Sequence, residues 1–217
     1  MRYELTNETK EIEVDGTTHT LHRIRALKKF NCQGRKVKVG DLGGFVETKR
    51  NLSQAQNSTA WVFDNAFVYG NTTVCDNATV YGSATVYDNA KVCNNAKVCG
   101  DATVCGSAEV CGSAEVCDNA KVCGDATVCD NAKVCDNAKV YGDATVYGDA
   151  KVFSSAEVYG DADISCSEDI YYDEVNSITY MKGRNGNLIL NVAFDDFIKT
   201  VKTNKEGKEN LSLSSLT

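Results

Sequence analysis

Apolar and polar residues alternate along the middle of the chain in a unit of six residues. Between Val62 and Ile164 this unit recurs eighteen times without an insertion, and its aliphatic position is Val at every repeat except the last. Ala follows four residues after the aliphatic position, with Thr72 as the one exception. In a stretch such as Ala-Lys-Val-Cys (residues 132–135), successive side chains of a strand point to opposite faces. Ala and Val are therefore expected to face inward, and each unit contains one short strand.

The two residues between successive strands predict tight corners. They read Gly-Asp, Asp-Asn, Gly-Ser or Asn-Asn, and these residues tolerate a positive φ angle. A six-residue period is typical of β-helices. We expect three units to close a triangular coil and eighteen units to stack as about six coils, about 30 Å long at the usual strand spacing. The residues alone do not determine the hand of the coil.

The period divides the chain into four parts, which we predict to be an N-terminal β-hairpin and cap region, a hexapeptide-repeat β-helix, a C-terminal cap and a disordered tail. The proposed bounds are 1–50, 51–166, 167–202 and 203–217. The tail is rich in Lys, Glu and Ser, a composition that buries too little apolar surface to fold.

Both caps follow from local patterns. Asp15-Gly16 separates two alternating stretches, 10–14 and 17–27, as in a type I′ hairpin. The C-terminal part suggests a hairpin over 177–192 and an amphipathic helix over 194–201. A solenoid needs such caps because its end coils expose apolar residues and unpaired backbone. The apolar residues expected to cover the N-terminal end are Leu42, Phe45, Val46, Leu52 and Trp61.

The residues that lead into the repeat carry a family resemblance. Residues 40–70 contain a Gly-Gly-aromatic-Val run, an Asn-Leu-Ser and a Trp-Val that precedes Asn-Ala. This segment and the repeat resemble YdcK-like hexapeptide-repeat proteins of bacteria and their phages, over about residues 20–164. The resemblance implies an all-β solenoid of the left-handed parallel β-helix type. Gly183-Arg184-Asn185 is also similar to phage-borne members of the family.

Charge is spread unevenly along the chain, whose net charge is −7. Residues 1–61 carry 11 basic and 7 acidic side chains, whereas residues 62–164 carry 6 basic and 15 acidic side chains. An acidic column does not favour nucleic acid, which binds basic surfaces. There is no long apolar run and no signal peptide, so we expect no membrane contact and a cytoplasmic protein, in a bacterium or in the host of a phage.

Side chains eighteen residues apart are expected to stack on one outer face. The outward positions form three cysteine stacks: Cys99-Cys117-Cys135, Cys75-Cys93-Cys111-Cys129 and Cys105-Cys123. We interpret these cysteines as strand residues interchangeable with Tyr, carrying free thiols in a reducing compartment. A soft-metal or redox role is the alternative. Lys91 and Glu109 should support the register of neighbouring coils, and the stack Asp125, Asp143 and Asp161 is expected to be solvated.

Histidine decides the enzymatic alternatives. The hexapeptide acyltransferases that the repeat resembles use a His base, and γ-type carbonic anhydrases bind zinc through three His. This chain has only His19 and His22, both in the hairpin, where we expect them on the surface. No catalytic residue, cofactor or metal ligand is therefore predicted.

The function expected from the sequence is that of a non-enzymatic, rigid interaction or scaffold protein. Its partner would be a protein or a second copy, as a dimer or trimer, and one version is a phage-encoded inhibitor of a host protein. The alternatives are a hexapeptide-type acyl or sugar transferase and a protein that sequesters a small ligand in clefts between subunits. The candidate interaction surface consists of Tyr69, Tyr87, Tyr141, Tyr159, Arg23, Arg25, Lys28 and Lys29.

Overall fold

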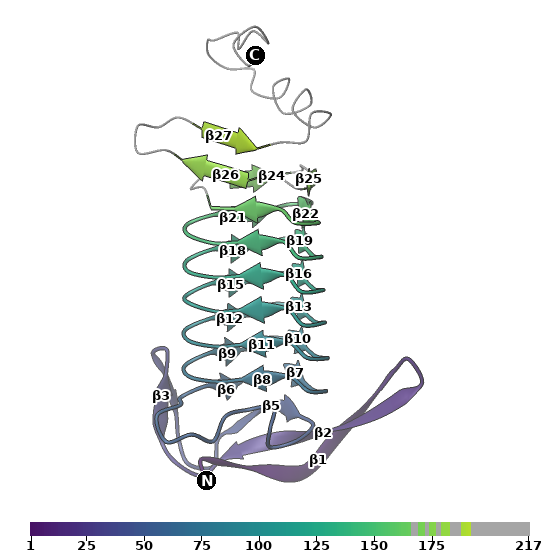
Figure 1. The fold of residues 1–217 in the computed structure, drawn as a ribbon. Coiled ribbons are helices and arrows are strands. Elements are labelled where there is room, and N and C mark those ends of the chain that lie inside the picture. The colour runs from purple at the N-terminus through teal and green to yellow at the C-terminus, as the bar shows by residue number, and fades with distance from the viewer. Residues whose placement is uncertain (166–168, 172–173, 177–178, 183–187, 192–217) are drawn as a thin grey trace, which may run out of the picture.

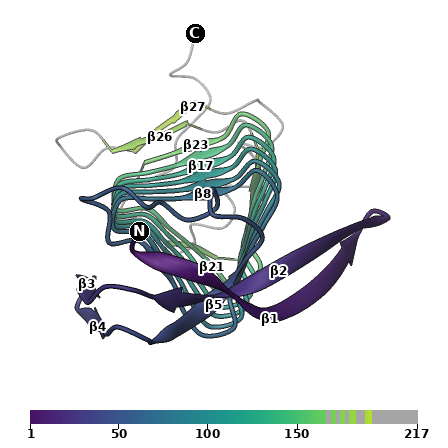
Figure 2. The same ribbon diagram turned by 90° about the horizontal axis from the view of Figure 1, so that it is seen from below.

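The middle of the chain forms a three-faced column of stacked β-strands, about seven turns tall (Figure 1). The computed structural model describes residues 1–165, 169–171, 174–176, 179–182 and 188–191. Seen along its axis, the column is a triangle with one parallel sheet on each side (Figure 2). The predicted all-β solenoid is thus confirmed.

Each sheet contributes one short strand to every turn. Face 1 contains β5 (Leu42–Val46), β7 (Phe67–Val68), β10 (Thr85–Val86), β13 (Thr103–Val104), β16 (Lys121–Val122), β19 (Lys139–Val140), β22 (Glu157–Tyr159) and β25 (Glu174–Asn176). Face 2 contains β8 (Thr73–Val74), β11 (Lys91–Val92), β14 (Glu109–Val110), β17 (Thr127–Val128), β20 (Thr145–Val146), β23 (Asp163–Ile164) and β26 (Thr179–Lys182). Face 3 contains β6 (Trp61–Val62), β9 (Thr79–Val80), β12 (Lys97–Val98), β15 (Glu115–Val116), β18 (Lys133–Val134), β21 (Lys151–Phe153) and β24 (Asp169–Tyr171).

The core of the column is the valine and alanine pattern read from the sequence. Strands pair in parallel with a register of eighteen residues, so that Val86 lies opposite Val104 and Val104 lies opposite Val122. The Val and Ala side chains of the repeat are at most 1% exposed. Burying one such valine stabilises the fold by about 1.5–3 kcal/mol. Stacking therefore explains how two-residue strands persist, because every coil is covered by its neighbours.

Each corner begins with a residue in the left-handed region of backbone space. The first corner residue has a positive φ in all units from Asp64 (φ 55°) to Gly160 (φ 64°). Where that residue is Asp, its carboxylate usually accepts a hydrogen bond from the next coil, as Asp88 Oδ2 does from the Gly106 amide at 3.1 Å. The same bond offsets the strain that a side chain adds at this φ. The predicted corners are confirmed.

The first coil begins earlier than the uninterrupted repeat. Val46 pairs with Val68, and Leu52 forms a bridge to Val74, so both are rungs of the column. The prediction that they cover its open end is wrong in this respect, because an expanded corner hides their register. That corner, residues 53–60, is held by Arg2, whose guanidinium donates to the Ser53, Ser58 and Ala60 carbonyls.

The ladder also continues beyond the end of the six-residue period. Ile170, Val175 and Tyr180 pair with Val152, Val158 and Ile164. Successive register positions are six and then five residues apart, which is why the pattern disappears from the sequence while the strand pairing persists. Strand β27 (Leu188–Asn191) pairs antiparallel with β26, within the predicted hairpin over 177–192. The helix predicted over 194–201 and the tail over 203–217 lie outside the described residues.

The base of the column carries two hairpin arms. The long arm consists of β1 (Tyr3–Val14) and β2 (Thr17–Ala26), and the short arm consists of β3 (Phe30–Cys32) and β4 (Arg35–Val37). The long arm turns at Asp15-Gly16, as predicted, and β2 pairs antiparallel with β5, so that the arm extends the face 1 sheet. Its tip projects beyond the side of the column (Figures 1 and 2).

The base closes the N-terminal end of the core. Trp61 is buried against the rings of Tyr3 and Phe30, at centroid distances of 6.0 and 5.3 Å. Leu42, which the sequence placed among these covering residues, is instead 51% exposed. Leu42 begins β5 and pairs with the arm at Arg25, so its side chain lies outside the triangle.

Candidate functional site

The long arm covers the lower part of face 1. Leu21 of β2, Phe45 of β5 and Tyr69 form a buried cluster, against which Ile12 and Tyr87 pack. The rings of Tyr69 and Tyr87 stack at 5.2 Å. Tyr69 is only 4% exposed, so the chain's own hairpin occupies this part of the predicted interaction surface.

Arg23 and Arg25, two basic residues of the predicted interaction surface, bind groups of the long arm and of β5 instead. Arg23 donates to Glu8 Oε1 at 2.8 Å and to the Gly43 carbonyl at 2.8 Å, and its guanidinium lies 4.3 Å from the centre of the Phe45 ring. Arg25 forms an ion pair with Glu4 at 3.2 Å. Arg23 is largely buried in these contacts, whereas Arg25 stays half exposed.

The prediction that His19 and His22 lie on the hairpin surface is wrong, because both side chains are partly buried. His19 Nδ1 lies 2.9 Å from Glu47 Oε1, and its ring packs at 4.9 Å from that of Tyr69. His22 Nδ1 lies 3.1 Å from the Thr6 carbonyl. Both histidines are partly buried because the arm folds back on face 1 and brings their side chains against it. No second histidine, cysteine or serine completes a nucleophile–base pair with either ring in the part of the chain that the structure describes.

The short arm clamps the neighbouring corner and face 3. Gln33 Nε2 donates to the carbonyls of Asn77 and Asn95, which lie in adjacent coils, at 2.7 and 3.0 Å. Arg35 places its guanidinium 4.9 Å from the Phe63 ring and 4.4 Å from the Tyr81 ring. Sequence reasoning missed this arm, although its Gln33-Gly34 turn, with positive φ at both residues, left a Gly signal.

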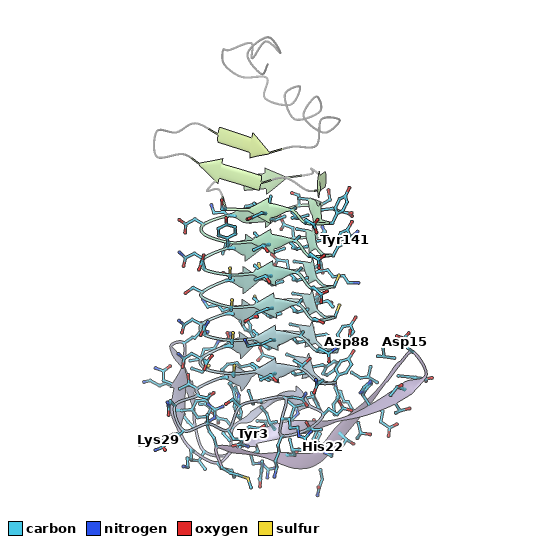
Figure 3. The ribbon with its side chains drawn as sticks, viewed as in Figure 1. Tyr3, Asp15, His22, Lys29, Asp88 and Tyr141 are labelled. Atoms are coloured by element: carbon cyan, nitrogen blue, oxygen red, sulfur yellow. The ribbon has the colours of Figure 1, made fainter. Side chains whose placement is uncertain are left out.

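Lys28 and Lys29 lie at the base, where Lys29 is visible in Figure 3. Both are exposed and line a surface groove of about 510 Å³ together with Met1, Arg2 and Phe30. Arg2 is buried, and this burial lowers the pKa of its guanidinium. Its bonds to the expanded corner mark Arg2 as a structural cation, so the groove offers two exposed lysines, and among the described residues no acidic side chain lines it.

The other pair of predicted tyrosines lies far from the base. Tyr141 and Tyr159 stack at 5.2 Å on the upper part of face 1, and Figure 3 shows Tyr141 on the flank of the column. The Tyr141 hydroxyl donates to Glu157 Oε2 at 3.1 Å, and Glu157 pairs with Lys139 at 2.7 Å. This patch is half-buried and lies beyond the reach of both arms.

Cysteine ladders occupy the middle of all three faces, in the stacks that the eighteen-residue spacing predicted. The ten described cysteines are free thiols. Burial raises the pKa of Cys75 to about 12 and those of Cys93 and Cys111 to about 11. In the face 3 stack, hydrogen bonding between neighbours raises the pKa of Cys99 and Cys117 and lowers that of Cys135, which accepts from Cys117.

Two neighbouring coils of face 3 bring two thiols close to a corner carboxylate. The Sγ atoms of Cys117 and Cys135 and a carboxylate oxygen of Asp118 all lie within 4.8 Å of one another. Asp118 occupies the corner directly after Cys117 and is exposed, while Cys135 is buried. Asp118 was not singled out from the sequence, because nothing in the repeat distinguishes it from the other corner aspartates.

Charge ladders run between the coils as the sequence suggested. Lys91 pairs with Glu109 at 2.8 Å, and Lys133 pairs with Glu115 at 3.1 Å. The corner carboxylates Asp125, Asp143 and Asp161 are exposed. Within the described residues, no helix has both the length and the apolar character needed to cross a bilayer.

Comparison with known proteins agrees with the architecture. Residues 74–88, which run from the end of β8 on face 2 through β9 on face 3 to β10 on face 1, match the family described as YdcK Beta solenoid repeat. No curated protein matches the chain.

Proposed function

We propose that this chain, a β-solenoid that carries a YdcK β-solenoid repeat, acts as a rigid, non-enzymatic interaction protein whose column binds a protein with a basic surface. The observation that carries the proposal is the flatness of the middle coils. From Trp61 to Ser165 the strands follow one another with two-residue corners and no inserted loop. Such faces offer shape and charge but no enclosed pocket for a small substrate.

The charge of the column supports a basic partner. Residues 62–164 have a net charge of −9, while residues 1–61 have a net charge of +4. Asp125, Asp143 and Asp161 stand one coil apart along the corner between faces 1 and 2, and all three are exposed. Neighbouring carboxylates repel one another, so a ligand that places basic side chains along this corner relieves the repulsion.

The aromatic side chains add an apolar part to the same edge of the molecule. Tyr141 and Tyr159 stack on face 1 in the coils that carry Asp143 and Asp161. Tyrosine next to charged groups is typical of protein interfaces, where it supplies area at a low cost in side-chain entropy. We propose this upper corner and its tyrosines as the contact surface, and we propose a left-handed coil, as in the hexapeptide solenoids that the repeat resembles.

A charge-matched pair of triple variants tests the proposal. Affinity capture from the lysate of the natural host would compare the wild type, D125N/D143N/D161N and E11Q/E13Q/D15N. Both variants change the net charge equally, but the second alters only the tip of the long arm. We expect the same basic protein to be retained by the wild type and by the arm variant and to be lost from the column variant.

Capture of no protein would contradict the proposal, and so would equal retention by all three forms. A phage-encoded inhibitor of a host protein is the version in which the retained protein loses its activity on binding. Adding the purified full chain to the retained protein and measuring the activity of that protein would separate inhibition from scaffolding.

A further inference from the structure

We propose that Cys117, Asp118 and Cys135 form a binding site for a thiophilic divalent cation of the Zn²⁺ type, on the corner that follows face 3. The site lies outside the surface proposed above and does not depend on it. Three observations carry the inference: the separation of the three ligand atoms, the unusual state of the Asp118 carboxylate, and the graded burial of the ligands.

The first observation is geometric. Zinc binds thiolate sulfur at about 2.3 Å and carboxylate oxygen at about 2.0–2.2 Å, in a tetrahedral arrangement. Two sulfur ligands of one such ion therefore lie about 3.8 Å apart. The Sγ atoms of Cys117 and Cys135 and the Asp118 oxygen fall within 4.8 Å of one another, so small side-chain rotations suffice to surround one ion. Water would complete the fourth position.

The second observation concerns the Asp118 carboxylate. Asp64, Asp76, Asp88, Asp130 and Asp136 occupy equivalent corners, and each carboxylate accepts the backbone N–H of the residue one coil higher. Asp118 also has a positive φ, of 57°. Among the described residues, however, no hydrogen bond is donated to its carboxylate, which lies beside the two thiols instead. Among the described aspartates at the first position of a corner, Asp118 is thus the one whose carboxylate does not accept the amide of the coil above.

The third observation is the access that the site allows. Cys135 is 6% exposed, Cys117 is half-buried and Asp118 is exposed. The sulfur atoms therefore form the floor of the site, and the carboxylate faces solvent, from which an ion would enter. Glu115 and Lys133 also lie near these thiols, but they pair with each other at 3.1 Å and add no net charge to the site. Soft sulfur with one carboxylate favours Zn²⁺ over Mg²⁺ or Ca²⁺, which prefer oxygen ligands.

Among the described residues, the other thiol stacks lack a carboxylate that lies beside two thiols and is left unbonded by the backbone. The Asp76 carboxylate accepts from the Cys75 thiol at 3.6 Å, but it is also held by the Asn94 amide at 3.1 Å. Cys105 and Cys123 stand one coil apart on face 1, but their corners begin with Gly106 and Gly124. Cys111 and Cys129 precede Gly112 and Asp130, and the Asp130 carboxylate already accepts the Gly148 amide at 3.2 Å. The pair Cys105 and Cys123 is therefore a control with the same thiol ladder and no carboxylate.

Cadmium titration of the reduced, chelator-treated full chain tests the site. Cd²⁺ is used in place of Zn²⁺ because thiolate-to-cadmium charge transfer is visible in the ultraviolet. We expect the first equivalent to bind tightly and to protect Cys117 and Cys135 from alkylation, as mapped by mass spectrometry. The double variant C117S/C135S should lose this tight equivalent.

Two further variants keep the test decisive even if the serine substitutions disturb the column. D118N alters an exposed side chain outside the core and should weaken the first equivalent by about tenfold or more, the scale on which loss of a supporting group already acts. C105S/C123S should bind as the wild type does. The proposal is overturned if the first equivalent protects other thiols, if D118N binds unchanged, or if C105S/C123S loses binding to the same extent.

Discussion

At the scale of single residues, the corners explain why this chain uses so few residue types between its strands. Every first corner residue from Asp64 to Gly160 has a positive φ, which glycine adopts without strain. A Cβ added at Gly106 would lie 2.8 Å from backbone atoms of Gly124, so some corners leave no room for a side chain. Where Asp is found instead, as at Asp88, its carboxylate binds the amide of the coil above. Glycine and aspartate are thus two solutions to the same backbone requirement.

The exception in the alanine series gives a first prediction. Thr72 is 1% exposed, and its hydroxyl oxygen has no hydrogen-bond partner among the described residues. A buried, unsatisfied hydroxyl costs about 1–3 kcal/mol. T72V keeps the size of the side chain and should raise the free energy of unfolding by that amount in urea denaturation. T73V, at an exposed neighbour, should change it by less than about 0.5 kcal/mol; a less stable T72V protein would contradict the argument.

The thiols predict a dependence on pH. Burial raises the pKa of Cys32, Cys93 and Cys111 from 9.0 to about 11 in the folded state. Because the neutral thiol is favoured by folding, the associated stability is present below about pH 9 and is lost as the pH rises through about 11. The urea concentration at the midpoint of unfolding should therefore decrease as the pH is raised from about 9 to about 11. At pH 8 Cys32, Cys93 and Cys111 of the folded chain should react with iodoacetamide at least about tenfold more slowly than in the urea-unfolded chain, as mapped by mass spectrometry, since the thiolate is the reacting form.

At the scale of elements, the two arms determine which outer side chains remain accessible. The long arm covers Tyr69 on the outer side of face 1, and the short arm places Arg35 over the rings of Phe63 and Tyr81. Aromatic residues near the base are therefore part of the intramolecular packing, while the cysteine ladders of faces 1 and 3 begin above the arms. The gradient from aromatic residues to cysteine along the column reflects this coverage on faces 1 and 3.

Loosening the short arm should expose Cys32, a thiol of the arm itself that is buried against the column. Cys32 of β3 is fully buried, and the arm is held by Gln33 and Arg35. The variant Q33A/R35A should increase the alkylation rate of Cys32 and the hydrogen exchange of residues 30–37, without unfolding the column. K36A, at an exposed position on the same arm, serves as the control and should leave both rates unchanged. Equal rates in the double variant and the wild type would show that other contacts hold the arm.

At the scale of the whole molecule, the column is a one-dimensional array. Each coil pairs with the coil above and the coil below, and its valines and alanines form one continuous core. The stability of such arrays is approximately a sum over units and their interfaces. The length of the column should therefore be adjustable in steps of eighteen residues.

Removal of one coil tests this view. Deleting residues 97–114 joins Ala96 to Glu115 and restores the register, so this variant should fold and should unfold in urea with a lower m-value, because less surface becomes exposed. Deleting residues 98–114, one residue fewer, places later side chains on the wrong face of their strands. That control should not fold. A folded control, or an unfolded eighteen-residue deletion, would refute the array description.

The sequence by itself determined the repeating part of this protein. Val and Ala at fixed spacing specify the inner face of each strand, Gly and Asp specify the corners, and Asp15-Gly16 specifies the turn of the long arm, because each of these preferences is local. The eighteen-residue coil then follows, and with it the stacking of Cys99, Cys117 and Cys135 on one face.

Only the tertiary structure decided the contacts between segments that do not repeat. The register of Leu52 is hidden by the expanded corner that follows it, and Arg35 meets Tyr81 through space rather than through any spacing in the chain. The same holds for Asp118, whose corner looks like its neighbours in sequence but whose carboxylate lies beside two thiols instead of an amide. Side-chain choice at such places depends on which polar groups the fold brings within reach, and that is decided by packing rather than by local preference.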